Sequence, residues 1–129
     1  MLTDKNEVII VNADPEQDAG ICRLLEKAGC LAQTVGSPAE LRDRLKDKTC
    51  IALIMDIDSV AVDNRAIKEI ATEFPDIPLL CISKEPFHPE LKDSILDSIY
   101  ACLTKPIDPD ELNYWVKCIR EDSRNHTAG

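Results

Sequence analysis

Three short apolar segments of this chain each end on a different polar side chain. The terminal residues are Asp56, Ser83 and Lys105. If these segments are parallel strands of one sheet, their carboxyl ends lie along a single edge, where open α/β sheets form their binding crevice. A carboxylate, a hydroxyl and an ammonium would then meet in one pocket. This set suits the transfer of a small anionic group to the carboxylate, with the lysine balancing its charge and the hydroxyl donating a hydrogen bond.

A helix-starting pattern occurs three times along the chain. It places an Asp or Ser at the N-cap, proline at the first helical position, and Glu or Gln at the third. The copies are Asp14-Pro15-Glu16-Gln17, Ser37-Pro38-Ala39-Glu40 and Asp108-Pro109-Asp110-Glu111. Each copy is followed by apolar residues at helical spacing, and the first helix is expected to end at Gly29. The pattern therefore predicts three of the helices from their starting residues.

Strands and helices alternate five times. The predicted strands are Val8–Val11, Leu31–Val35, Ile51–Met55, Leu79–Ile82 and Ala101–Leu103. Besides the three capped helices, the apolar spacing predicts helices over Asn64–Phe74 and Pro89–Ile99. The second strand is the most polar and reads as an edge strand, whereas continuous apolar strands are covered on both faces. This order predicts an α/β fold, a doubly wound (βα)5 parallel sheet with right-handed crossovers.

Composition limits the class of partner. The chain has 129 residues and a formal net charge of −9, which predicts one acidic domain and disfavours binding to nucleic acid or to anionic membranes. No apolar run approaches the roughly 18 residues of a membrane span, and the first residues lack a signal-peptide pattern, so a cytoplasmic location is expected. We expect one domain over residues 1–122 and a frayed polar tail, or the start of a linker, over 123–129.

The six cysteines do not have the spacing of a metal site. There is no C-x-x-C pair and no paired histidine, so a zinc site is disfavoured and the cysteines are predicted to be reduced, mostly buried thiols. Cys30 and Cys50, which flank apolar runs, are expected to be the most exposed.

A (βα)5 chain with these strand ends resembles the CheY-like receiver domain of two-component response regulators. Ser83 follows Asp56 by 27 residues, Lys105 follows Ser83 by 22, and Leu103-Thr104-Lys105-Pro106 matches the lysine motif of that family. The resemblance covers about residues 6–122 and implies the flavodoxin-like strand order 2-1-3-4-5. It implies that Asp56 is the phosphoacceptor, that Lys105 pairs with the phosphoryl oxygens and that Ser83 donates a hydrogen bond to them.

The resemblance also implies a signalling role rather than an enzyme. The chain would at most phosphorylate itself from phosphodonors and lose the group again. A sensor histidine kinase or a phosphotransfer protein would supply the phosphoryl group. The surface formed by the fourth helix, the fifth strand and the fifth helix would carry the signal and the contacts of a homodimer.

The metal half of the pocket departs from the family. The resemblance implies Mg²⁺ held by Asp56, by the main-chain carbonyl of Asp58 and by two acids after the first strand, but Asn12 and Ala13 occupy those two positions. Asp14 is the remaining acid there, and the helix cap explains it better than a metal role. Weak Mg²⁺ binding is therefore expected.

Three further positions around the pocket are candidates for binding or switching. Lys84 replaces a small residue after Ser83, where it would crowd the phosphate or add a second cation. Cys102 occupies the position of the aromatic switch residue, for which Tyr100 is a weak substitute. The bond before Pro106 is expected to be cis, because the family typically has a cis bond there.

Two functions stay open from the sequence. One is a phosphoryl-accepting receiver, and the other is a phosphorylation-independent, receiver-like interaction module that lacks the acidic pair for Mg²⁺. A flavin-binding flavodoxin is disfavoured because Asn12-Ala13-Asp14-Pro15 is not a glycine- or serine-rich phosphate loop. A hydrolase is disfavoured because His88 and His126 both lie in polar contexts without a nucleophile beside them.

Overall fold

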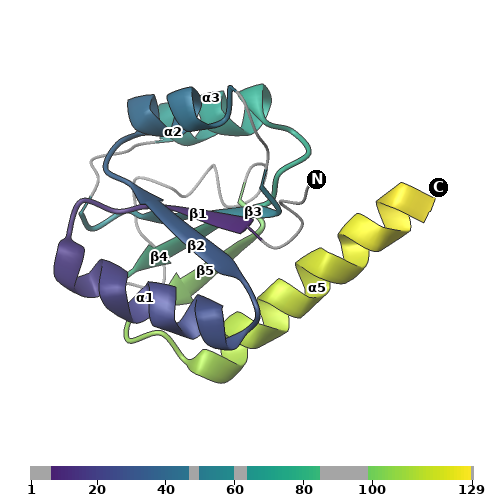
Figure 1. Cartoon of the computed structure of the whole chain (residues 1–129). Helices are drawn as coiled ribbons and strands as arrows, with labels where there is room; N and C mark the ends of the chain where they lie inside the picture. The colour runs from purple at the N-terminus through teal and green to yellow at the C-terminus, as the bar shows by residue number, and fades with distance from the viewer. Residues whose placement is uncertain (1–6, 47–49, 60–63, 85–98, 129) are drawn as a thin grey trace.

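The chain folds into one five-stranded parallel sheet with helices on both faces (Figure 1). This computed structural model describes residues 7–46, 50–59, 64–84 and 99–128. The strand order is β2-β1-β3-β4-β5, which confirms the predicted fold class and order. The strands are β1 (Glu7–Val11), β2 (Leu31–Val35), β3 (Ala52–Asp56), β4 (Leu79–Ser83) and β5 (Ala101–Thr104).

The described helices begin where the sequence predicts. They are α1 (Pro15–Lys27), α2 (Pro38–Arg44), α3 (Asn64–Glu73) and α5 (Pro109–Ala128). The Ser37 hydroxyl accepts a hydrogen bond from the Glu40 N–H at 3.2 Å, and the Asp108 carboxylate accepts one from the Asp110 N–H at 2.9 Å. Gly29 follows α1 with a φ of +85°, a conformation that side chains disfavour. The helix predicted over Pro89–Ile99 lies, up to residue 98, outside the described residues.

Two apolar cores lie on opposite faces of the sheet. Helices α2 and α3 cover one face, where Leu41 and Ile70 are buried, and α1 and α5 cover the other, where Leu25 and Val116 are buried (Figure 1). Every residue of β1, β3 and β4 is buried, as expected for strands covered on both faces. Strand β2 forms an edge of the sheet, as its polarity predicts, and Leu31 on it is exposed.

The sheet order decides which loops meet at the functional edge. Because β1 pairs directly with β3, Val11 lies in register with Met55, and the residues after both strands are neighbours. Strand β4 lies between β3 and β5, and Asp56 pairs with Ile82 on it. Side chains from three strand ends can therefore reach one another above the carboxyl edge of the sheet.

The expectation that Cys30 and Cys50 are the most exposed cysteines is wrong. Cys30 and Cys50 are buried: Arg120 covers the first and donates to its sulfur at 3.4 Å, and the Cys50 thiol donates to the Ala52 carbonyl at 3.4 Å. Helix α5 extends to Ala128, and the polar tail or linker start expected over residues 123–129 stays a prediction. The predicted domain boundary at residue 122 stays a prediction.

The six cysteines all lie among the described residues and form no disulfide with one another, as predicted. Burial raises the pKa of Cys81, and the charge of the neighbouring Cys102 adds to that rise. In the part of the chain that the structure describes, no helix has the length and apolar character needed to cross a membrane.

A matched pair of leucines tests the assignment of the core. Leu25 is fully buried, so Leu25→Ala is expected to lower the free energy of unfolding by about 2–5 kcal/mol. Leu31 is 66% exposed, so Leu31→Ala is expected to change it by less than about 0.5 kcal/mol. Urea unfolding followed by circular dichroism measures both values. Equal losses in the two variants would contradict the assignment.

Candidate functional site

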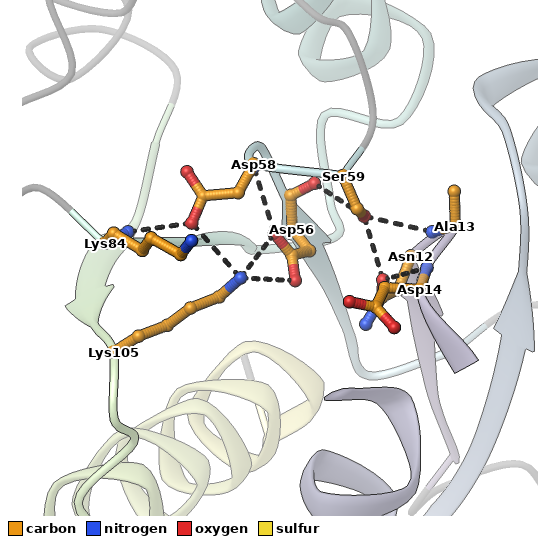
Figure 2. Close-up of polar contacts among 8 residues, drawn as sticks. All are labelled: Asn12, Ala13, Asp14, Asp56, Asp58, Ser59, Lys84 and Lys105. Atoms are coloured by element: carbon orange, nitrogen blue, oxygen red, sulfur yellow. Dashed lines mark hydrogen bonds and ion pairs between the residues drawn. The ribbon is translucent and has the colours of Figure 1, made fainter. Parts of the chain in front are cut away.

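Asp56 and Lys105 form an ion pair at the carboxyl edge of the sheet, as their positions predict (Figure 2). The Lys105 ammonium lies 2.8 Å from Asp56 Oδ2 and 3.0 Å from Oδ1. The Asp56 side chain is 0% exposed and that of Lys105 is 13% exposed, so water screens this pair little. The pair joins β3 to the residue that follows β5, across the intervening β4.

Ser83 lies at the same edge of the sheet. It is the last residue of β4, it is buried, and its register partner on β5 is Thr104. Its carbonyl accepts the Lys105 N–H at 2.8 Å, which extends the β4–β5 pairing by one residue and aligns the lysine. The three predicted residues thus share one edge, with Asp56 and Lys105 in direct contact.

The ammonium of Lys105 is shared between two carboxylates. It also lies 3.1 Å from Asp58 Oδ2. Burial by itself lowers the pKa of Lys105, but hydrogen bonds to Asp56 and Asp58 and the charges of both carboxylates outweigh burial and raise that pKa. Lys105 is therefore a permanent cation in the pocket at neutral pH.

The side chain of Asp58 takes part in the site, which the sequence analysis did not anticipate. Its Oδ2 accepts a hydrogen bond from the Lys84 N–H at 2.9 Å, and its own N–H donates to Asp56 Oδ1 at 3.0 Å. The prediction concerned only the main-chain carbonyl of Asp58, and its role as a metal ligand stays a prediction. The available signal in the sequence was an acid two residues after Asp56.

A neutral hydrogen-bond bridge joins the loops after β1 and β3. Asn12 is buried, and its Oδ1 accepts the Asp14 N–H and the Ser59 hydroxyl, each at 2.8 Å. The Ser59 oxygen in turn accepts the Ala13 N–H at 3.0 Å (Figure 2). The sequence analysis missed Ser59, whose only signal is a hydroxyl three residues after Asp56.

The residues present do not fit the magnesium site that the resemblance implies. An amide oxygen has two lone pairs, and both of those on Asn12 Oδ1 already accept hydrogen bonds. Ala13 has no ligand atom, and both oxygens of Asp56 face the Lys105 ammonium. Among the described residues, no group of three or more His, Cys, Asp or Glu side chains forms a metal cluster.

The amide nitrogen of Asn12 is also unsuited to a magnesium site. Asn12 Nδ2 is buried and has no hydrogen-bond acceptor among the described residues. Exchanging the oxygen and the nitrogen would place an N–H donor against the Asp14 N–H, so the observed orientation is the consistent one. A buried N–H donor repels a cation. Asp14 itself stands at the N-cap position, immediately before α1.

The remaining candidates surround this centre. Lys84 is exposed and contributes its main-chain N–H to the site. Cys102 is half-buried in β5, in register with Cys81, and burial raises the pKa of its thiol. The Lys105–Pro106 bond is cis, as expected. The Tyr100 ring lies edge-on to that of Trp115 at a centroid distance of 5.7 Å.

Many solved structures that are similar to this chain are receiver domains. The receiver domain of nitrogen regulatory protein C has a TM-score of 0.78 at 23% identity over 95% of this chain and 99% of that one. A CheY-like receiver domain from Methylobacillus flagellatus has a TM-score of 0.76 at 19% identity over 88% and 98%. No protein-family model and no curated protein sequence matches the chain.

One similar structure contains a metal ion. The receiver domain of a sensor histidine kinase from Pseudomonas aeruginosa has a TM-score of 0.76 at 17% identity, over 90% of this chain and 98% of that one. Magnesium is coordinated in its active-site cleft. The chain described here shares the fold of that receiver domain.

The ion pair predicts a large stability effect at Lys105. Lys105→Met leaves buried Asp56 without its cation and is expected to cost about 3 kcal/mol of unfolding free energy. Lys84→Met removes an exposed ammonium and keeps the main-chain bond to Asp58, so a change below about 0.5 kcal/mol is expected. Urea titrations of both variants at pH 7 give the comparison. A loss at Lys105 no larger than that at Lys84 would contradict the pairing.

The same pair predicts a pH dependence. The pKa of Lys105 is raised above its ordinary value of 10.5 by its partners, so its stabilising contribution is complete below pH 10.5 and is lost as the pH rises through the folded-state pKa. The stability difference between wild type and Lys105→Met is therefore expected to narrow in alkali. Unfolding titrations at several pH values above neutrality measure this stability difference. A difference that widens as the pH rises would contradict the predicted direction of the pH dependence.

Proposed function

We propose that this chain is a receiver domain of a two-component signalling system that accepts a phosphoryl group on Asp56. One observation carries the proposal: a buried carboxylate at the carboxyl edge of a 2-1-3-4-5 sheet has a lysine ammonium on both of its oxygens. The receiver-domain fold of the similar structures supports it.

The chemistry needs a nucleophile and donors for an anion. An Asp56 oxygen attacks phosphorus in a phosphohistidine or a small phosphodonor, the bond from phosphorus to the leaving nitrogen or oxygen breaks, and an acyl phosphate forms. The Lys105 ammonium balances the negative charge that arrives, and the Ser83 hydroxyl donates a hydrogen bond to a phosphoryl oxygen. Because Asp56 has no exposed surface, a donor reaches it only when surrounding side chains move, so we expect slow uptake.

Magnesium has a minor role in this proposal. Receiver-type chemistry places Mg²⁺ where it neutralises the phosphoryl group, but Asn12 and Ala13 do not supply that site, and the Ser59 bridge occupies it with hydrogen bonds. We therefore propose weak Mg²⁺ binding at most, with Lys105 as the main counter-charge.

The proposed role is signalling and not metabolism. The partner would be a sensor histidine kinase or a phosphotransfer protein, and self-phosphorylation and loss of the acyl phosphate would be the only reactions. The signal would leave through the surface of the helix before β5, β5 itself and α5, which would also be the surface of a homodimer. A cytoplasmic location is part of this proposal.

A second function has its own support. Asn12, Ser59 and Ala13 link the loops after β1 and β3, and Lys105 links β3 to β5, so the pocket is internally bonded without a phosphoryl group or a metal. A phosphorylation-independent interaction module would need only this arrangement. Phosphoryl uptake separates the two functions.

Incubation with acetyl phosphate tests the acceptor. We expect intact-mass spectrometry to show one added phosphoryl group on the wild-type protein, and none on Asp56→Asn, because the neutral amide lacks the anionic oxygen that attacks phosphorus. An adduct that persists in Asp56→Asn would show that another residue is the acceptor. No adduct on the wild type would favour the interaction module.

Introducing acids at positions 12 and 13 tests whether their absence explains weak Mg²⁺ binding. The double variant Asn12→Asp/Ala13→Asp adds two carboxylates beside Asp56, and we expect Mg²⁺ affinity to rise by at least about tenfold, because affinity for hard cations follows the number of charged oxygen ligands. Isothermal titration calorimetry with MgCl₂ compares the variant with wild type. Lys68→Glu, at an exposed position of α3, makes the net charge more negative by the same two units and serves as the control. Tight Mg²⁺ binding by the wild type would contradict the conclusion that the residues present do not fit a magnesium site.

A further inference from the structure

The carboxylate of Asp58 binds one donor from the end of β4 and one from the end of β5. Its Oδ2 accepts the Lys84 N–H at 2.9 Å and lies 3.1 Å from the Lys105 ammonium. Its N–H bonds to Asp56 Oδ1 at 3.0 Å, which holds Asp58 beside the acceptor (Figure 2). One side-chain oxygen thus connects the loop after β3 to the next two strands of the sheet.

This connection is not the usual hydrogen bond of a turn. An Asp in a turn bonds most often to a main-chain N–H two residues further on, within its own loop. The Asp56 carboxylate makes that local bond here, to the Asp58 N–H, whereas Asp58 Oδ2 reaches Lys84, 26 residues away in sequence. The contact is therefore a tertiary one, and its acceptor is the negatively charged Asp58 carboxylate.

The two donors are suited to a phosphoryl group. An anionic oxygen binds best where a main-chain N–H and an ammonium converge, because charge-assisted hydrogen bonds are the strong ones. A phosphoryl group on Asp56 would arrive next to Lys105, whose ammonium already contacts Asp56 and Asp58. The Asp58 carboxylate therefore holds donors that the phosphoryl group would need.

We propose that Asp58 is an internal anionic ligand that stands in for the phosphoryl group in the unmodified domain. It ties the ends of β4 and β5 to the loop after β3 before any phosphorylation. It also opposes phosphorylation, because Asp58 must release Lys105, or share it with a second anion, when the phosphoryl group arrives. The opposition to phosphorylation rests on the proposed function, whereas the tie between the strands does not. Asp58 is thus a positioning residue, and it forms no bond to phosphorus.

Two substitutions separate the charge of Asp58 from its hydrogen bond. Asp58→Asn keeps an oxygen that can accept the Lys84 N–H but loses the charge, and Asp58→Ala loses both. Asp76→Ala removes one negative charge from an exposed turn and serves as the matched control. Each protein is measured in two ways: by the rate of phosphoryl uptake from acetyl phosphate, followed by intact mass, and by hydrogen exchange of the Lys84 amide, followed by NMR without phosphodonor.

The proposal makes a different prediction for each readout. Removal of a like charge beside the acceptor is expected to speed uptake on the order of tenfold in Asp58→Asn and Asp58→Ala, and to leave Asp76→Ala at the wild-type rate. Exchange of the Lys84 amide is expected to speed up about tenfold in Asp58→Ala only, because Asp58→Asn keeps the acceptor. A structural role alone would change exchange without changing uptake.

The outcomes distinguish this inference from the proposed function. If the wild type is phosphorylated but uptake is unchanged or slower in both Asp58 variants, the proposed competition between Asp58 and the phosphoryl group for Lys105 would be overturned. An unchanged exchange rate of the Lys84 amide in Asp58→Ala would overturn the tie between the strands. Absence of uptake in every variant would overturn the proposed function and the competition with it, and the exchange of the Lys84 amide would still decide the tie.

Discussion

The burial of Asp56 is the constraint on which the site depends. A carboxylate with no exposed surface is costly unless a cation or several donors compensate it. Lys105 supplies the cation, and it reaches Asp56 because β5 lies two strands away and the Lys105 N–H extends the pairing with β4. The parallel sheet, with its apolar strands buried on both faces, therefore both isolates the carboxylate and brings its partner to it.

The other half of the pocket is held together without charge. Where a metal ion would attract acids from two loops, Asn12 and Ser59 join the loops by hydrogen bonds between neutral groups. A typical neutral hydrogen bond contributes about 1 kcal/mol net, and it does not require an ion to be bound. These bonds link the two loops on one side of Asp56, and the Lys105 pair links β3 to the residue after β5 on the other side.

The fold was predictable from the sequence because the strand pattern, the helix caps and the strand-end residues all indicate the same parallel sheet. Apolar runs of strand length alternate with capped helices, and the three strand-end residues occur at one edge as expected. The contacts of Asp58 and Ser59 were not predictable, because they depend on how the turn after β3 directs its side chains, and no periodicity reports that. Cys30 was misjudged for a similar reason: a distant arginine on α5 covers it.

Charge balance connects these observations. Asp56 and Asp58 bring two negative charges to the single ammonium of Lys105. A phosphoryl group adds still more negative charge, and the residues after β1 add no compensating metal. A phosphoryl group on Asp56 would therefore require Lys105 to leave one carboxylate or to be shared with the added group. Asp58 is less buried than Asp56, so its release costs less desolvation energy. Under the proposed function, the position of one ammonium between two acids therefore controls how readily the pocket accepts a phosphoryl group.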